Sequence, residues 1–237
     1  MIDLSCLGGN KNILNIFNIL RYKRAFAKEH PGYFRPDGLL IFCGAQGEGK
    51  TLSAVDYVKK LSWDYPRAII CTNVEIKGLN PLCKVVEYQG LESLTSIENG
   101  YYGVIYLIDE IHLEFNSLES KNIPIEVMIE VSQQRKQRKH IVGTSQQFMR
   151  LAKPLREQVK NLVICRKMFG CMQFNKLIDG STITERDGHI RMEVKKRCIW
   201  FHSPVMYDSY DTYKKMRRYR EEWQGVSRSS IYSDINV

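Results

Sequence analysis

The stretch that most constrains the fold is residues 44–51, with the sequence Gly-Ala-Gln-Gly-Glu-Gly-Lys-Thr. An apolar run, residues 39–43, precedes it, and residues 52–61 follow it with one apolar stripe at helical spacing. Strand, glycine-rich loop and helix are the context in which G-x-x-x-x-G-K-[ST] forms a phosphate site. The loop N–H groups and the positive end of the helix then face the same anion. The predicted nucleotide-binding residues are Gly44, Ala45, Gln46, Gly47, Glu48, Gly49, Lys50, Thr51 and Leu52.

Two side chains of this loop have defined tasks in such a site. Lys50 is expected to reach the β- and γ-phosphates, and the Thr51 hydroxyl is expected to bind Mg²⁺. The cofactors predicted from the sequence are therefore ATP and Mg²⁺. The alternative interpretation is a glycine-rich turn between a strand and a helix that binds no ligand.

A second motif lies about sixty residues downstream. Residues 103–108 form an apolar strand that ends in Asp109 and Glu110, the pattern of a Walker B element. Acids at that strand end lie beside the phosphate loop, where Asp109 would hold the metal and Glu110 would polarise the attacking water. Alone this is a weak signal, since strand ends often carry acids. Together with the loop it favours an ATPase over a small-molecule kinase, which needs no hydrolytic glutamate.

Polar and basic residues follow the next predicted elements. Residues 141–146 form a buried strand whose last residue, Gln146, could contact the γ-phosphate or the water; the alternative is a polar strand end that begins a helix at Gln147. A helix is predicted over residues 125–138, with a basic end that suits either an arginine finger or an edge facing nucleic acid. The arginine-finger candidates are Arg135, Arg138, Arg150 and Arg156.

The chain of 237 residues is long enough for one sizeable core, and its net charge is +9. Such a charge suggests a polyanionic partner, which could be nucleic acid, an anionic membrane or an acidic protein, unless it serves solubility alone. The candidate DNA-contacting residues are Lys136, Lys139, Lys195, Lys196, Arg197, Lys214, Lys215, Arg217 and Arg218.

The seven cysteines are scattered and form no C-x-x-C pair, which argues against a zinc site and a disulfide scaffold and fits a reducing cytosol. No apolar run has the length of a membrane-spanning helix, and no secretory signal is recognisable.

The expected organisation has three parts. Residues 1–37 form a helical extension, with a helix around residues 11–28; residues 38–223 form the ATPase domain; residues 224–237 form a flexible tail. Further predicted elements are strands at 67–72, 84–88 and 161–167, a helix at 91–99, a helix from 147, a strand at 190–201 and a helix at 213–223. Asp179-Gly180 is predicted to be a hairpin turn. The fold class is α/β: a mainly parallel central sheet flanked by helices, with a C-terminal antiparallel β-hairpin extension.

The order of these motifs resembles the zonular-occludens-toxin-like family of filamentous phages, which is related to the FtsK–HerA superfamily of P-loop ATPases. The resemblance covers roughly residues 37–215 and includes Thr72-Asn73-Val74, Gln134-Arg135-Lys136, Thr144-Ser145-Gln146 and Tyr210-Asp211-Thr212. It implies a RecA-like P-loop NTPase core of the additional-strand, catalytic-glutamate type, often hexameric, with ATP bound between subunits. By that resemblance, Gln146 is the sensor at the strand end. The filamentous-phage members carry a membrane-spanning helix that this sequence lacks, which favours the soluble packaging ATPases of the same superfamily.

The predicted function is an ATP-hydrolysing motor that translocates DNA, as in viral genome packaging. Expected partners are DNA, copies of the chain in a ring of six or a similar number, and a docking protein at a capsid portal, at a vertex or on a membrane. The expected location is the host cytoplasm, at the virion or at the inner face of a membrane. The alternatives are a phage assembly or export ATPase that powers extrusion without gripping DNA, a nucleotide kinase, and a scaffold without catalysis.

Overall fold

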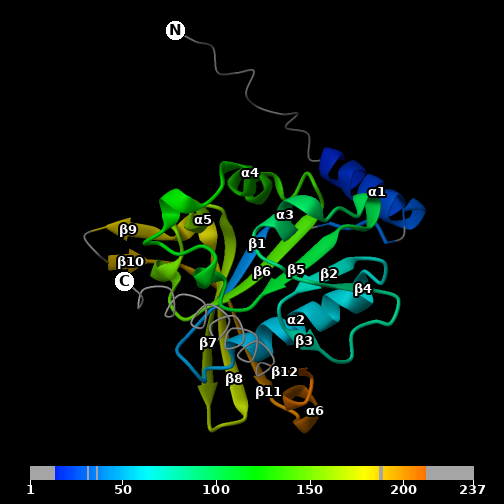
Figure 1. Cartoon of the computed structure of the whole chain (residues 1–237). Helices are drawn as coiled ribbons and strands as arrows, with labels where there is room; N and C mark the ends of the chain where they lie inside the picture. Colours follow the sequence, from blue (N-terminus) through cyan, green and yellow to red (C-terminus); the bar gives the residue numbers. More distant parts are fainter. Residues whose placement is uncertain (1–13, 31, 36, 187–188, 212–237) are drawn as a thin grey trace, which may run out of the picture. The chain divides into compact units, whose positions relative to one another are not determined.

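A computed structural model describes residues 14–30, 32–35, 37–186 and 189–211 (Figure 1). The chain divides into two compact units, residues 1–33 and residues 34–237. The first unit contains α1 (Leu14–Glu29), which confirms the predicted helix over its described residues. Within this unit the ring of Phe26 packs on His30 and Tyr33, with centroid distances of 4.4 and 5.1 Å.

The second unit is built on an eight-stranded sheet with the order β11-β8-β7-β1-β6-β5-β2-β4. All pairs from β7 to β4 are parallel, whereas β8 and β11 are antiparallel to their neighbours. The strands are β1 (Leu39–Cys43), β2 (Ile69–Thr72), β4 (Lys84–Glu87), β5 (Val104–Ile108), β6 (Lys139–Ser145), β7 (Val159–Met168), β8 (Met172–Asp179) and β11 (Val194–Phe201). This confirms the predicted fold class and most of the predicted strands.

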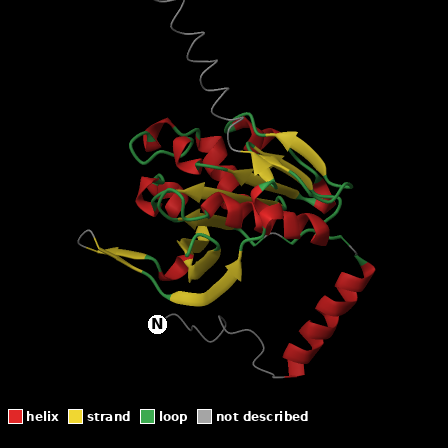
Figure 2. Ribbon diagram, turned by 90° about the horizontal axis from the view of Figure 1, so that it is seen from below, coloured by secondary structure: helices red, strands yellow, loops and turns green. Residues whose placement is uncertain are grey.

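β1 and β5 are continuous apolar runs, as expected of strands that helices cover on both faces (Figure 2). Every residue of β1, β5 and β6 is buried. On one face α2 (Lys50–Asp64) packs Ala54, Val55 and Val58 into a hydrophobic cluster. On the other face lies a second cluster, to which three short helices contribute. These are α3 (Glu92–Ser96), α4 (Ile125–Gln133) and α5 (Lys153–Arg156).

The strand order brings the two sequence motifs to one edge of the sheet. β6 lies between β1, which leads into the phosphate loop, and β5, which ends in the acidic pair. This intervening strand is the additional strand that the resemblance implied. Because the three strands are parallel, the loop, the acids and the end of β6 meet at their carboxyl edge.

The antiparallel part differs in detail from the prediction. The β7–β8 hairpin turns at residues 169–171, where φ is 52° at Phe169 and 72° at Gly170. The predicted hairpin turn at Asp179-Gly180 is wrong. The Asp179 carboxylate accepts hydrogen bonds from the Ser181 N–H and hydroxyl, and a 3₁₀ turn, Gly180–Thr182, follows. The predicted strand at 190–201 is two strands, of which β10 (His189–Arg191) pairs with β9 (Thr184–Arg186).

Two predicted helices are shorter than expected. α4 ends at Gln133, and residues 134–138 form turns that end with Arg138 at a φ of 55°. A continuous helix from Gln147 is also wrong, because a 3₁₀ turn, Phe148–Arg150, is separated from α5 by extended residues. The predicted helix at 213–223 and the tail at 224–237 lie outside the described residues.

The remaining small elements lie near the end of the described chain. α6 (Pro204–Tyr207) follows β11, and β12 (Tyr210–Asp211) pairs antiparallel with β3 (Glu75–Ile76). The six cysteines of the described part are free thiols. No helix among the described residues has the length and apolar character that crossing a membrane requires.

Candidate nucleotide-hydrolysis site

The phosphate loop is held close to the β7–β8 hairpin. A Cβ atom at Gly44 would lie 2.7 Å from the Cys165 carbonyl oxygen, and one at Gly49 would lie 2.2 Å from Oε1 of Gln173. Gly49 also has a φ of 74°, which a side chain would strain. The glycines therefore permit both the curl of the loop and its close approach to these strands.

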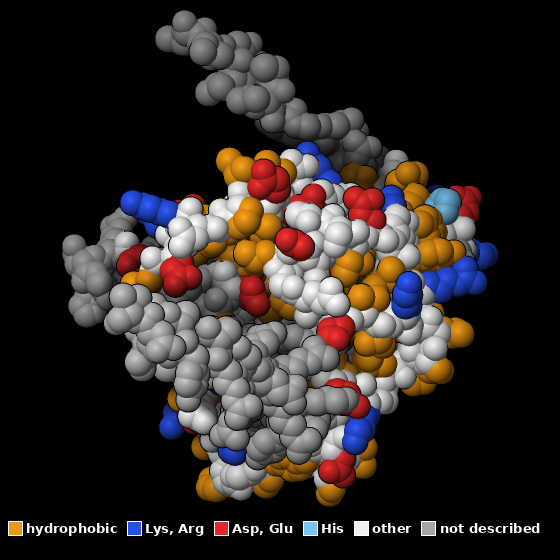
Figure 3. All heavy atoms as spheres, in the orientation of Figure 1, with side chains coloured by type: hydrophobic (Ala, Val, Ile, Leu, Met, Phe, Trp, Pro, Cys, Tyr) orange, Lys and Arg blue, Asp and Glu red, His pale blue; other side chains and the backbone are white. Residues whose placement is uncertain are grey.

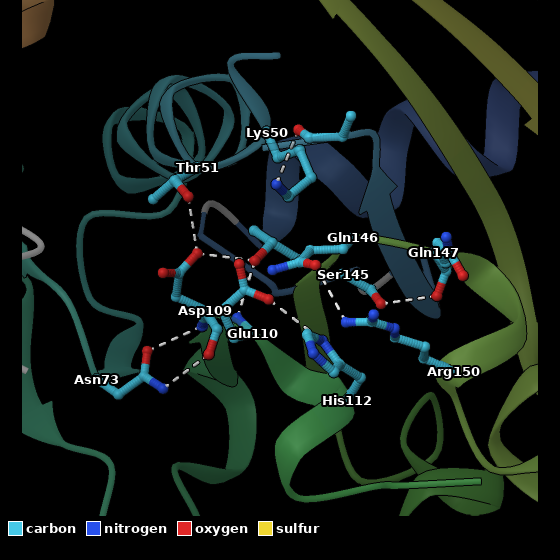
Figure 4. Close-up of polar contacts among 12 residues, drawn as sticks. Lys50, Thr51, Asn73, Asp109, Glu110, His112, Ser145, Gln146, Gln147 and Arg150 are labelled. Atoms are coloured by element: carbon cyan, nitrogen blue, oxygen red, sulfur yellow. Dashed lines mark hydrogen bonds and ion pairs between the residues drawn. The ribbon is translucent and has the colours of Figure 1, made fainter. Parts of the chain in front are cut away.

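Lys50 lies inside the curl of the loop. Only 6% of its surface is exposed, and its Nζ donates to the Ala45 carbonyl oxygen at 3.2 Å (Figure 4). A buried ammonium group surrounded by loop backbone is suited to bind phosphate oxygens. Burial raises the pKa of the neighbouring Cys43 thiol to about 12, so no thiolate competes at the end of β1.

Asp109 is fixed by side chains from three different elements (Figure 4). Its Oδ1 accepts hydrogen bonds from the hydroxyls of Thr51 at 2.8 Å and Thr144 at 2.7 Å. The Asn73 side chain accepts from the Asp109 N–H at 2.8 Å and donates to the Asp109 carbonyl oxygen at 3.1 Å. The aspartate thus occupies one position relative to the loop.

A hydroxyl and a carboxylate oxygen that touch each other are the hard oxygen ligands Mg²⁺ prefers, so Thr51 and Asp109 fit the predicted metal site. No group of three or more His, Cys, Asp or Glu side chains suited to a metal occurs in the part of the chain that the structure describes. Thr51 and Asp109 would supply two ligands, and the nucleotide and water would supply the others.

Glu110 leaves the strand in a left-handed conformation, with φ at 54°. Its N–H donates to the Thr144 hydroxyl at 2.9 Å, so a single threonine fixes both acids. Its carboxylate Oε2 lies 3.2 Å from Nδ1 of His112, which is buried in the 3₁₀ turn Ile111–Leu113. The carboxylate of Glu110 remains partly exposed and has an oriented partner, which suits a general base.

The end of β6 lies next to Glu110 in Figure 4. Gln146 Oε1 accepts a hydrogen bond from Arg150 Nη1 at 3.0 Å, and the Ser145 hydroxyl donates to the Gln147 carbonyl oxygen at 2.9 Å. The structure thus places Gln146 at the acidic edge, and among the finger candidates it brings Arg150 there.

The other finger candidates lie elsewhere in this chain. Arg135 and Arg138 precede β6, whose first residue pairs with Val104, so they lie at the opposite edge of the parallel strands. Arg156 makes an ion pair with Glu185 at 3.3 Å.

One DNA-contact prediction is wrong, because Lys139 is 2% exposed and its Nζ is bound to Glu130 and the Leu94 carbonyl oxygen, both at 2.8 Å. Lys136 is exposed at the edge opposite the loop, and Lys195, Lys196 and Arg197 are exposed on β11. Lys195 lies 3.7 Å from Asp179. The remaining four candidates, Lys214, Lys215, Arg217 and Arg218, lie outside the described residues.

Three residues that contact the site were not assigned these roles from the sequence: Asn73, His112 and Gln173. Asn73 follows β2 as Asp109 follows β5, and the two strands are neighbours, but the sequence alone does not give that strand order. His112 is two residues beyond Glu110, but only the left-handed turn at Glu110 brings the two together. Gln173 lies more than a hundred residues from the loop, and no local pattern indicates its contact.

Fold and site together define this unit as a P-loop NTPase fold, with the nucleotide loop and acidic strand end in one constellation. A search of solved structures finds chains similar in fold. The N-terminal domain of zonular occludens toxin from Neisseria meningitidis matches with a TM-score of 0.52 and 18% identity over 73% of this chain and 98% of that chain. The genome packaging NTPase B204 from Sulfolobus turreted icosahedral virus 2, in complex with ATP-gammaS, has a TM-score of 0.49 and 11% identity over 66% and 96%. The flagellar accessory protein FlaH from Methanocaldococcus jannaschii has a TM-score of 0.42 and 12% identity over 72% and 95%.

No protein-family profile matches the sequence. No curated protein matches it either. At 18% identity the likeness to the zonular occludens toxin domain shows the fold, which agrees with the family resemblance noted in the sequence.

Proposed function

We propose that this chain is an ATP-hydrolysing motor that moves DNA, of the kind that packages a viral genome. The observation that carries hydrolysis is the 2.8 Å contact between Thr51 of the phosphate loop and Asp109, with Glu110 as the next residue. The DNA-moving part rests on the sequence resemblance and on the net charge of +9.

In the proposed reaction, the loop N–H groups and Lys50 hold the triphosphate. Mg²⁺, held by Thr51 and Asp109, would neutralise phosphate charge when bound. Glu110 accepts a proton from the water that attacks the γ-phosphorus, and the bond to the β–γ bridging oxygen breaks. His112 orients the Glu110 carboxylate, and Gln146 with Arg150 contacts the γ-phosphate side of the site.

Around this reaction we propose a ring of copies that grips the DNA backbone in a sequence-tolerant way, with a docking protein at a portal, vertex or membrane. Contacts to phosphates make such binding strongly salt-dependent. The scattered free cysteines support a setting in the host cytoplasm.

The test is the rate of phosphate release with and without DNA at two salt concentrations, together with the mass of the assembly in ATP and DNA. Stimulation by DNA that weakens as salt rises, in an assembly of several copies, is the expected result. ATP hydrolysis that no DNA stimulates, with no DNA binding at low salt, would contradict the motor and leave an assembly or export ATPase. Transfer of the γ-phosphate to a nucleoside without free phosphate would instead show a kinase.

A further inference from the structure

At the free end of the β7–β8–β11 sheet, the polarity of the side chains changes along the strands. On the face that carries Phe174, the strand pairing forms three rows of three residues. From the root outward these rows are Ile164–Lys176–Arg197, then Arg166–Phe174–Ile199, then Met168–Met172–Phe201. Cations thus occupy the two inner rows, and the outermost row is wholly apolar. None of the nine residues is acidic.

Apolar side chains extend this outermost row into the solvent. Phe169, at the tip of the hairpin, is 85% exposed, and Phe201 beside it is 70% exposed. α6 lies against the same turn, because the Tyr207 hydroxyl donates to the Gly170 carbonyl oxygen at 3.3 Å. We name Met168, Phe169, Phe201, Val205 and Tyr207 the apolar tip, and Arg166, Lys176 and Arg197 the basic collar.

Figure 3 shows hydrophobic side chains at the end of the second unit where Figure 1 places α6, with both basic and acidic side chains close by. One exposed acid, Asp208, follows α6. A tip of this kind is unusual on a soluble surface, where large apolar side chains are normally scattered singly.

The conformation of Phe169 is a second, independent observation. A φ of 52° is rare for a bulky aromatic residue, and glycine or asparagine would adopt it at lower cost. An exposed aromatic ring in a strained turn contributes no core packing. A contact outside the described part of the chain would account for an aromatic residue at this position.

From this arrangement we infer that the apolar tip and basic collar form a docking site for an anionic membrane surface. The tip would enter the boundary between headgroups and acyl chains, while the collar meets negatively charged lipid headgroups. The wholly apolar outermost row favours a bilayer over single-stranded nucleic acid, which would require cations beside the aromatic rings at the tip. The inference goes beyond the proposed motor, because it concerns where the chain is held and not what it hydrolyses.

The docking site is physically connected to the phosphate loop. Gln173, on the opposite face of β8 from Phe174, is fully buried, and its Nε2 donates to the Glu48 carbonyl oxygen at 2.9 Å. Its Oε1 lies 3.1 Å from Nε2 of His202, whose Nδ1 lies 2.6 Å from the Tyr207 hydroxyl. A membrane contact at Tyr207 would therefore act on the loop through two side chains.

The test is cosedimentation of the full chain with phosphatidylcholine vesicles that contain or lack phosphatidylserine. The wild type should bind only the anionic vesicles. Phe169→Asn with Phe201→Thr should weaken this binding at least ~10-fold, since asparagine tolerates the turn and threonine suits a strand. Arg166→Gln with Lys176→Gln should weaken it about 30-fold, because each cation contributes about fivefold.

Matched controls lie on other surfaces of the same unit. Trp63→Gln removes an aromatic side chain that is 62% exposed on α2, and Lys84→Gln with Lys121→Gln removes two exposed cations. Neither control should change vesicle binding. All variants should hydrolyse ATP in solution as the wild type does. If the wild type itself does not hydrolyse ATP, that result contradicts the proposed function and leaves the docking site unaffected.

Three results would overturn the inference. The first is a wild type that does not bind anionic vesicles. The second is a tip variant that binds them as tightly as the wild type. The third is an effect of the tip variants confined to binding of an oligothymidylate or to self-association in sedimentation.

Discussion

The parallel and antiparallel strands belong to one hydrogen-bonded sheet, but their side chains are buried to different extents. Every residue of β1, β5 and β6 is buried, whereas every residue of β11 is at least partly exposed. Because both faces of β1, β5 and β6 are buried, Asp109 and Glu110 at the end of β5 are held in one position. Exposure on one face leaves the hairpin end free to contact another body. In our proposals, chemistry and docking belong to different parts of one sheet, which meet at the loop through Gln173 and Glu48.

The largest expected effect is in the parallel part. Asp109→Ala removes the acceptor shared by Thr51 and Thr144, so ATP hydrolysis should fall at least ~100-fold. The measurement is phosphate release at saturating ATP and Mg²⁺, with Asp56→Asn, on the exposed side of α2 near Lys60, as the control. A rate close to that of the wild type would mean that the acidic strand end is not the hydrolytic centre.

Burial in the parallel part also predicts a pH dependence. His140 lies between the Gly38 carbonyl oxygen and the Tyr57 hydroxyl, and burial lowers its pKa from 6.5 to about 4. The unfolded chain then binds a proton that the folded chain does not, so stability should fall as pH falls from about 6.5 to about 4. The full loss from this residue is about 3 kcal/mol.

Urea unfolding of the wild type and of His140→Gln across this pH range isolates the effect. The variant should be less stable at neutral pH through lost hydrogen bonds, and its curve of stability against pH should be flatter. Equal slopes for the two proteins would show that His140 is not held neutral.

The junction between the two parts should show an intermediate effect. Gln173→Leu leaves the Glu48 carbonyl oxygen without its donor, so the loop loses a support and nucleotide affinity should fall ~10-fold. Calorimetric titration with a non-hydrolysable ATP analogue measures this change, and Gln158→Leu, at an exposed site before β7, is the control. An unchanged affinity would show that the hairpin does not support the phosphate loop, and would contradict the proposed connection between the parallel and antiparallel parts.

The smallest effect is expected at the hairpin tip. Phe169→Gly relieves the left-handed strain and should raise the free energy of unfolding by up to about 1 kcal/mol, with ATP hydrolysis in solution unchanged. Denaturant unfolding provides the value. A destabilised variant would show that the Phe169 ring packs within the chain, contrary to its exposure.

The sequence predicted the parallel part well because its signals are local. The apolar run before Gly44 and the run before Asp109 each report a strand buried on both faces, and the strand ends locate the loop and the acids. The clamp on Asp109 was not predictable in the same way. Thr144 and Asn73 reach it only because β6 and β2 are the neighbours of β5, and strand order is a property of the whole sheet.

The antiparallel part was predicted less well, for a physical reason. Asp179-Gly180 has the composition of a hairpin turn, but the Asp179 carboxylate is satisfied by Ser181, and the hairpin turns at Phe169 instead. Phenylalanine is a poor residue for that turn, so tertiary pairing of β7 with β8 overrides local preference. Lys139 likewise belonged to a basic run in the sequence, although Glu130 neutralises it inside the unit.

The most direct measurement of the central claim is ATP binding and ATP hydrolysis by Glu110→Gln. This substitution keeps the shape of the side chain and removes the carboxylate that would accept the proton from water. Hydrolysis should fall at least ~100-fold while ATP affinity stays within about threefold of the wild type. Hydrolysis at the wild-type rate would contradict the assignment of Glu110 as the base.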